Sequence, residues 1–223
     1  QADDAIRDVE RSRGLGDVYK RQGSIDMEEK KNKAKPDSLV WEKLGSRYEE
    51  AGLMLFEKRI DSLRNPRNNK AFDRLVLESV DWVNVVALDE ERRSVMIRQF
   101  RFGVGYVTLE TPGGMVDPGE DSEMAAKREL KEETGYKSDH WTYLGCVEPN
   151  PAFHNHLCHH WLAEDAYLDD EQTLGEGEMI NIELMGEAQV RDCVASGELK
   201  HALALSALSR VFQLWSLPHR QPY

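Results

Sequence analysis

The chain has 223 residues, 40% of them hydrophobic and 31% charged, which is enough for one sizeable domain with a core, alone or with a small extra subdomain. No apolar run approaches the ~20 residues that a transmembrane helix needs, and no stretch has the apolar centre of a secretory signal, so no membrane partner is expected. The formal net charge of −12 argues against a general nucleic-acid binder, which would need a basic surface.

The cysteines favour a reducing compartment. Cys146, Cys158 and Cys193 are odd in number, scattered, and contain no C-x-x-C pair. Such a set is unsuited to a disulfide framework or a structural zinc knuckle, so a cytoplasmic protein is expected. If the substrate is anionic, it must be screened from the negative charge of this protein, and a bound divalent metal is the obvious means.

The N-terminal 38 residues differ from the rest of the chain. They are polar and charged without a sustained apolar period, and the segment RSRGLGDVYKRQ (11–22) resembles translated sequencing-adapter read-through. We interpret residues 1–38 as a non-native leader up to residue 26, with Met27 as the candidate native start, followed by a flexible charged arm.

Residues 39–80 are predicted to form an N-terminal strand subdomain. Strands are expected over 53–63 and 71–80, separated by the segment RNPRNNK, whose Asn and Pro residues suit a loop.

Residues 81–216 are predicted to form the main domain, followed by a tail at 217–223. Strands are expected over 82–88, 94–101, 107–112, 141–148, 155–163 and 180–185, and helices over 122–134, 186–196 and 201–215. The blend of strands with a few helices predicts an α+β fold with a mostly antiparallel or mixed sheet.

Two of these helices carry local signals in their sequences. The helix over 122–134 is expected to be capped by Asp121 or Ser122 and to end at Gly135. The last helix has Leu205, Leu208, Phe212 and Trp215 at spacings of three and four, which predicts a stripe that faces the core.

Three carboxylates share one face of the helix over 122–134. At about 100° per residue, Glu129, Glu132 and Glu133 fall within about 100° of one another. An isolated acidic triplet is usually a solvated stretch that favours helix formation. Packed carboxylates also repel one another, and they are tolerated where a hard cation such as Mg²⁺ or Mn²⁺ sits between them. Arg128 is placed to pair with Glu132 or with Glu120 in the preceding loop.

The string around this helix is far more specific than the triplet. Gly114, five residues, Glu120, seven residues, Arg-Glu-Leu (128–130), one residue, Glu-Glu (132–133), one residue and Gly135 match the Nudix box, with Tyr136 where the family usually has an aliphatic residue. Residues 80–215 therefore resemble the Nudix hydrolases. The resemblance implies an α/β/α sandwich and hydrolysis of a nucleoside diphosphate linked to another group X.

The resemblance assigns roles by motif position. Glu129, Glu132 and Glu133 would be ligands of Mg²⁺, for which Mn²⁺ could substitute, and Glu133 would be essential for catalysis. The backbone carbonyl of Gly113 would be a further ligand. The remaining fixed positions would be structural: Gly114 and Gly135, and the ion pair between Glu120 and Arg128 that braces the loop against the helix.

The flanks of the box resemble the ADP-ribose and ADP-sugar pyrophosphatases. IRQFRFG (97–103), LETPGG (109–114), GELKHALALSAL (197–208) and Pro151, fifteen residues after Tyr136, correspond to segments of that group. This implies a nucleotide-sugar substrate split into AMP and a sugar phosphate. Gly113 departs from the Ala of the tightest ADP-ribose matches, which weakens the substrate assignment.

The resemblance also suggests residues outside the box. GEGEMINIELM (175–185) resembles the segment that supplies a glutamate as general base, either Glu176 or Glu178, and the sequence does not separate the two. Arg101 is a candidate for the substrate's phosphates and Glu110 for the metal or its waters, the alternatives being an exposed strand arginine and a salt-bridged glutamate.

Trp41 is a weaker candidate, for stacking on the adenine, with core or interface packing as the alternative. In this group the N-terminal strands often exchange across a homodimer, and residues 39–80 suit that arrangement; a hairpin packed on its own domain is equally allowed. A homodimer is expected.

The segment HNHLCHH (154–160) invites a transition-metal interpretation. His154, His156, Cys158 and His160 would alternate onto one face of a strand. Because no second ligand cluster accompanies them, we interpret them as polar strand residues that line the substrate cleft.

Two alternatives to an ADP-sugar hydrolase remain open. The same chemistry could act on GDP-mannose, NADH or a dinucleoside polyphosphate. The chain could instead be a Nudix-fold sensor that binds such a ligand without cleaving it. Sensors are expected to have lost box glutamates, and all of them are present here, which favours an enzyme.

Overall fold

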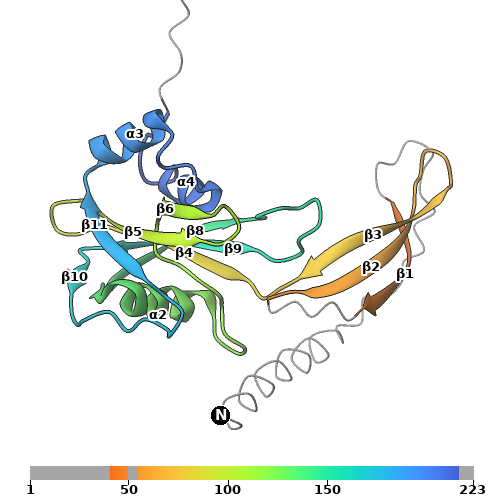
Figure 1. Cartoon of the computed structure of the whole chain (residues 1–223), viewed down its shortest axis with the longest axis horizontal. Coiled ribbons are helices and arrows are strands. Elements are labelled where there is room, and N and C mark those ends of the chain that lie inside the picture. The colour runs from red at the N-terminus through yellow and green to blue at the C-terminus, as the bar shows by residue number, and fades with distance from the viewer. Residues whose placement is uncertain (1–40, 50–54, 216–223) are drawn as a thin grey trace, which may run out of the picture. The chain divides into compact units, whose positions relative to one another are not determined.

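The computed structural model describes residues 41–49 and 55–215 (Figure 1). The predicted leader and arm at 1–38 and the tail at 217–223 lie outside the described residues. In the part that is described, no helix is both long and apolar enough to cross a membrane. The chain divides into two compact units: an N-terminal unit up to Ser79 that also contains Asn150–Asn155, and a C-terminal unit of Val80–Pro149 and the residues from His156 onward.

The N-terminal unit is an antiparallel sheet in the order β1-β2-β3. Its strands are β1 (Glu42–Glu49), β2 (Glu57–Arg64) and β3 (Ala71–Glu78). The sequence predicted β3 well, predicted the start of β2 four residues too early, and gave no strand at β1. The reason is that β1 is almost entirely exposed and has no apolar alternation. Its main chain pairs with β2, and polar side chains add contacts within the sheet, such as Arg47 with Asp73 (2.8 Å) and Ser46 with Asp61 (2.6 Å).

The C-terminal unit contains the remaining strands and the helices of the described part of the chain. Its strands are β4 (Trp82–Ala87), β5 (Ser94–Arg101), β6 (Tyr106–Glu110), β7 (Tyr136–Lys137), β8 (His140–Val147), β9 (Cys158–Glu164), β10 (Tyr167–Leu168) and β11 (Ile180–Met185), and its helices are α2 (Ser122–Thr134), α3 (Glu187–Ser196) and α4 (Ala202–Leu208). The order β4-β9-β8 has a parallel β4–β9 pair, whereas β11-β5-β6 is antiparallel. The predicted α+β fold with a mixed sheet is confirmed.

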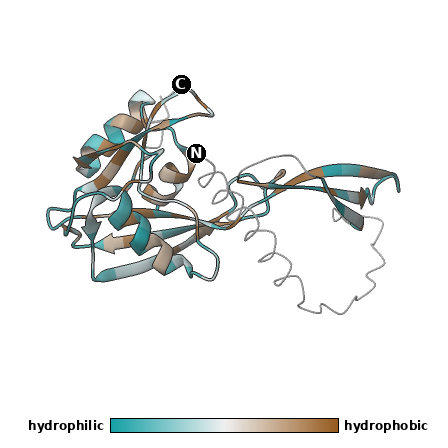
Figure 2. Ribbon diagram, turned by 60° about the horizontal axis from the view of Figure 1, so that its bottom comes forward, coloured by the Kyte–Doolittle hydropathy of each residue, from teal (hydrophilic) through white to brown (hydrophobic). Residues whose placement is uncertain are grey.

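Strand β4 contributes buried apolar side chains on both of its faces, and this makes the unit a sandwich. Val83, Val85 and Ala87 pack with Ala125, Ala126 and Leu130 of α2. The alternate residues Val86 and Leu88 join a second core with residues of α3 and α4. Figure 1 shows α2 on one side of the strands and α3 and α4 on the other. Hydrophobic colour runs along the strands between these layers (Figure 2).

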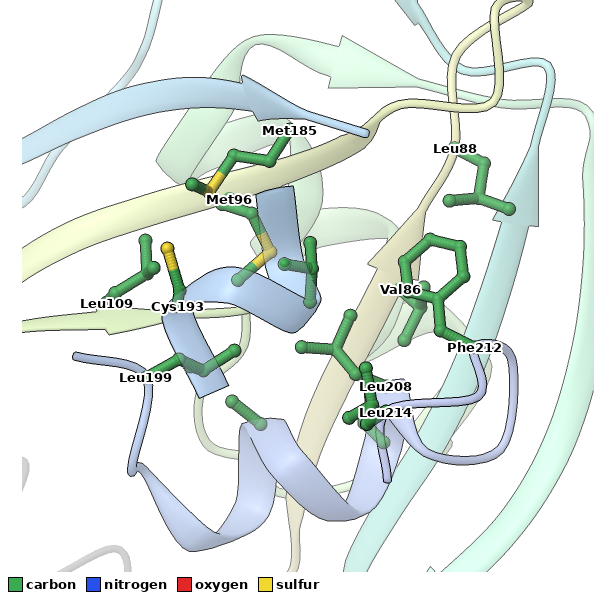
Figure 3. Close-up of a cluster of buried hydrophobic side chains, with 13 residues drawn as sticks. Val86, Leu88, Met96, Leu109, Met185, Cys193, Leu199, Leu208, Phe212 and Leu214 are labelled. Carbon is green, nitrogen blue, oxygen red and sulfur yellow. The ribbon is translucent and has the colours of Figure 1, made fainter. Parts of the chain in front are cut away.

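The last helix is shorter than predicted, because α4 ends at Leu208 rather than at residue 215. The chain continues in tighter turns, with the N–H of Val211 donating to the carbonyl of Leu208. These turns bring both Phe212 and Leu214 into the core beside Leu208 (Figure 3), whereas Trp215 of the predicted stripe is exposed. The residues after Leu208 therefore follow the packing of the core and not the helical spacing of three and four.

Candidate active site

Helix α2 is bounded by the local signals that its sequence contains. The Asp121 side chain accepts a hydrogen bond from the N–H of Met124 (2.9 Å), and Gly135 takes the left-handed conformation (φ 71°) that ends the helix. Packing of α2 against the sheet also buries part of its acidic face. Glu133 as a residue is 5% exposed, and the side chains of Glu129 and Glu132 are 14% and 47% exposed.

Arg128 joins the preceding loop to this acidic face. Its Nη2 donates to Glu120 Oε2 (2.9 Å) and to the carbonyl of Met115 (2.8 Å). Its Nη1 donates to Glu129 Oε1 (2.7 Å) and to Glu132 Oε2 (3.3 Å). The hydrogen bonds from Arg128 lower the pKa of Glu120, so this carboxylate stays ionised and holds the loop.

The two glycines before the helix lie close to other atoms of the site. The N–H of Gly113 donates to Glu133 Oε2 (2.8 Å), and a Cβ at this position would lie 2.1 Å from the carbonyl oxygen of Val83. A Cβ at Gly114 would lie 2.4 Å from the Glu129 carboxylate. The main chain of Val83 leaves no room for a Cβ at position 113. This explains why the chain has Gly113 where the tightest ADP-ribose matches have Ala.

Burial shapes the electrostatics of the acidic face. It raises the pKa of Glu133 to about 8, with a further contribution from the charge of Glu129. Burial also raises the pKa of Glu129, against the opposing effect of Arg128. Two desolvated carboxylates this close together are costly unless positive charge compensates them, and oxygen donors of this kind suit a hard divalent cation.

The carboxylates do not form a ready-made metal cage. Across residues 41–49 and 55–215, no three His, Cys, Asp or Glu side chains are grouped so that they could hold a metal ion. Glu129 is instead directed to Arg128, and Glu133 to the N–H of Gly113. The donor set fits a divalent cation by its chemistry, and the metal-ligand roles remain predictions.

Arg101 and Glu110, which were proposed as separate contacts, bind each other. Arg101 Nε and Nη2 donate to the two oxygens of Glu110 at 2.8 and 2.7 Å. Thr108 Oγ1 also donates to Glu110, and His201 Nε2 lies 3.5 Å from it. Burial alone would raise the pKa of Glu110, but the hydrogen bonds from Arg101 and the nearby His201 outweigh it and lower that pKa. Sequence reasoning singled out neither Thr108 nor His201. His201 lies in the segment 197–208 that resembles the pyrophosphatases, but nothing in the sequence places it beside Glu110.

The roles of the two candidate general bases remain predictions. The charge of Glu178 adds to the raised pKa values of Glu129 and Glu133, as a smaller contribution than burial. Glu176 and Glu178 are both exposed. The Glu178 carboxylate accepts a hydrogen bond from the N–H of Gly175 (2.7 Å), which directs it within its turn.

Trp41 belongs to the N-terminal unit. Its ring lies 5.7 Å from that of Phe72, and the Arg74 guanidinium stacks over it at 5.4 Å. These contacts are packing within that unit, and a role in adenine stacking remains a prediction.

The expected row of four polar residues on one strand face is wrong, because β9 begins only at Cys158. His154 instead stacks on Phe56 in the N-terminal unit, and His156 packs against Trp82 in the C-terminal unit. Cys158 and His160 are fully buried rather than lining an open cleft. Burial raises the pKa of the Cys158 thiol to about 12, which disfavours the thiolate that a metal would require.

The site lies within a region that matches a known family. The NUDIX domain model matches residues 80–204, more than half of the chain. The chain belongs to the NUDIX domain family. The predicted resemblance is thereby confirmed, and the box that suggested it lies at the centre of the matched region.

Curated relatives of this Nudix domain include two ADP-ribose pyrophosphatases. That of Bacillus subtilis (strain 168) is 33% identical over 116 residues, which cover 52% of this chain and 63% of the relative. That of Mycobacterium tuberculosis is 32% identical over 110 residues, which cover 49% of this chain and 53% of the relative. The chain therefore spans less than two thirds of the length of either protein.

A solved structure shares the fold. The crystal structure of an ADP compounds hydrolase matches with a TM-score of 0.68 and 24% identity, covering 78% of this chain and 94% of that chain. At this identity the similarity establishes the Nudix architecture and nothing finer.

Proposed function

We propose that this Nudix protein hydrolyses the pyrophosphate bond of a nucleoside diphosphate linked to X in a Mg²⁺-dependent reaction. ADP-ribose or an ADP-sugar is the proposed substrate, giving AMP and a sugar phosphate. The observation that carries the proposal is the acidic face of α2, where the buried Glu133 and the partly buried Glu129 lie beside the more exposed Glu132, and Glu133 bonds with the glycine loop. The names of the two curated pyrophosphatases support the choice of substrate.

The proposed metal ligands are Glu129, Glu132, Glu133 and the carbonyl of Gly113. Buried carboxylates with raised pKa values favour a bound cation, since it would supply the positive charge that Arg128 gives only in part. A bound Mg²⁺, or Mn²⁺ in its place, supplies neutralisation of diphosphate charge and a water of lowered pKa.

Other residues of the chain would orient the substrate and move a proton. Arg101 uses Nε and Nη2 to bind Glu110, so Nη1 is not part of that pair and is available for a phosphate oxygen. Glu110 would thus orient the guanidinium rather than contact the substrate itself. Glu178 would accept the proton of the attacking water, because its charge lies within electrostatic range of the acidic face. Positioning and electrostatic stabilisation are the main catalytic effects in such a displacement.

The proposal includes a cytoplasmic homodimer in which the N-terminal strands take part. The exposed side chains of Leu44, Tyr48 and Leu75 on the N-terminal sheet support it, since large apolar groups on an open sheet favour association. Light scattering coupled to size-exclusion chromatography gives the mass directly, and a monomer at micromolar concentration would remove this part of the proposal.

The test is a substrate panel with the purified full chain. ADP-ribose, ADP-glucose, GDP-mannose, NADH and diadenosine polyphosphate are each incubated with Mg²⁺, and the released nucleotide is measured. Preferential release of AMP from ADP-ribose supports the whole proposal, whereas cleavage of another compound keeps the chemistry and removes the ADP-ribose assignment. No cleavage with either Mg²⁺ or Mn²⁺ contradicts the proposed activity, and calorimetric binding of ADP-ribose in that case would favour a sensor.

A further inference from the structure

The loop before β11 is attached to the C-terminal end of α2. The last four carbonyls of a helix lack partners within the helix. Here the N–H of Thr173 donates to the carbonyl of Glu132 (2.9 Å), and the Gln172 side-chain amide donates to the carbonyl of Glu133. The N–H of Asp169 donates to the carbonyl of Gly135 just beyond the helix (2.9 Å). The loop thus satisfies the end of the helix that carries the acidic face.

Gln172 makes a second contact that closes this loop on itself. The same Nε2 atom donates to the carbonyl of Ile180 (3.3 Å), where β11 begins. An amide nitrogen carries two hydrogens, so both bonds can form together. The Gln172 side chain therefore links the two ends of the segment 172–180. The same side chain also holds this segment to the main-chain carbonyl of Glu133.

Glu178 lies within the segment that is closed in this way. Its N–H donates to the carbonyl of Gly175 (3.0 Å), and its carboxylate accepts from the N–H of Gly175 (2.7 Å). These two hydrogen bonds fix the Glu178 side chain within its turn. The Gln172 amide, which donates to the carbonyls of Glu133 and Ile180, holds the segment that contains this turn to the end of α2 and to the start of β11.

We propose that Gln172 is a positioning residue that holds the Glu178 loop against the Glu133 end of α2. This inference rests on the proposed function for its catalytic meaning, in which Glu178 is the base. A displacement of about 1 Å can lower a rate by about 100-fold, so loss of the anchor should affect turnover more than substrate binding.

The first test is hydrogen exchange, which needs no substrate. Gln172→Met keeps the length of the side chain and removes both donors. We expect exchange in the segment 172–180 to become about tenfold faster, since two hydrogen bonds are lost. Gln189→Met is the matched control, because Gln189 makes its hydrogen bond with the N–H of Gly186 at the start of α3. Unchanged exchange in Gln172→Met would overturn the inference.

The second test is a double-mutant cycle in activity, with a substrate cleaved by the wild type. Gln172→Met is expected to lower kcat about 10- to 100-fold with KM changed less than about threefold. In the Glu178→Gln background it should lower kcat no further, because Gln172 acts through Glu178. An equal loss in both backgrounds would refute the positioning role. A wild type that cleaves nothing would refute the proposed function instead, and hydrogen exchange would still decide whether Gln172 holds the loop.

Discussion

His160 is buried without compensation, and this should make the stability of the protein depend on pH. It lies on β9 with 0% exposure, and neither of its ring nitrogens has a hydrogen-bond partner among the described residues. Burial lowers its pKa to about 4, with smaller contributions from the positive charge of Arg210 and from His159. Folding therefore holds the imidazole neutral at pH values where an unfolded chain would protonate it.

The sign and size of the effect follow from proton linkage. Between the ordinary histidine pKa of about 6.5 and the folded value, the unfolded state binds one more proton than the folded state, so the free energy of unfolding falls as the pH falls. With the folded pKa of His160 at about 4, the loss at pH 5 relative to neutral pH is about 2 kcal/mol. Replacement by leucine, which has a similar volume, removes this loss.

The assay is urea unfolding of the wild type and of His160→Leu at pH 7.5 and pH 5. The variant should gain about 2 kcal/mol on the wild type between the two pH values. It should also be at least as stable as the wild type at pH 7.5, because two buried polar atoms without partners have been removed. Parallel pH dependence of the two proteins would refute the reasoning, since it would mean that His160 titrates alike in both states.

Three further predictions concern the acidic face and its loops. Glu133→Gln should lower kcat about 100-fold or more while the melting temperature stays within a few degrees. The control variant Glu123→Gln, on the exposed side of α2, should leave kcat unchanged. Equal kcat values for these two variants would contradict the assignment of the site. Glu178→Gln should lower kcat about 100-fold or more and Glu176→Gln by less than about twofold, and similar mild effects would mean that the base lies elsewhere. Gly113→Ala should lower the free energy of unfolding by about 1–3 kcal/mol, because the Cβ of the alanine would meet a main-chain oxygen of β4. The measurement is thermal unfolding, and an unchanged melting temperature would show that the loop can shift.

The elements whose signals are local can be predicted from the amino-acid sequence. Helix α2 has the predicted bounds, because its cap at Asp121 and its left-handed end at Gly135 depend only on neighbouring residues. Strands β5 and β11 also have the predicted bounds. The Nudix box was recognisable because its positions have fixed spacing along one helix and one loop, and it identified the family.

Features that join residues far apart in the chain are visible only in the folded protein. Arg101 bonds with Glu110 although the register of β5 and β6 places Arg101 opposite Tyr106 and Glu110 opposite Ile97. The contact of Gln172 with α2 joins two segments that are adjacent only after folding. A local sequence pattern shows the period of a single helix or strand. The register of strands and the path of a loop depend on contacts between elements, so they appear only in the folded chain.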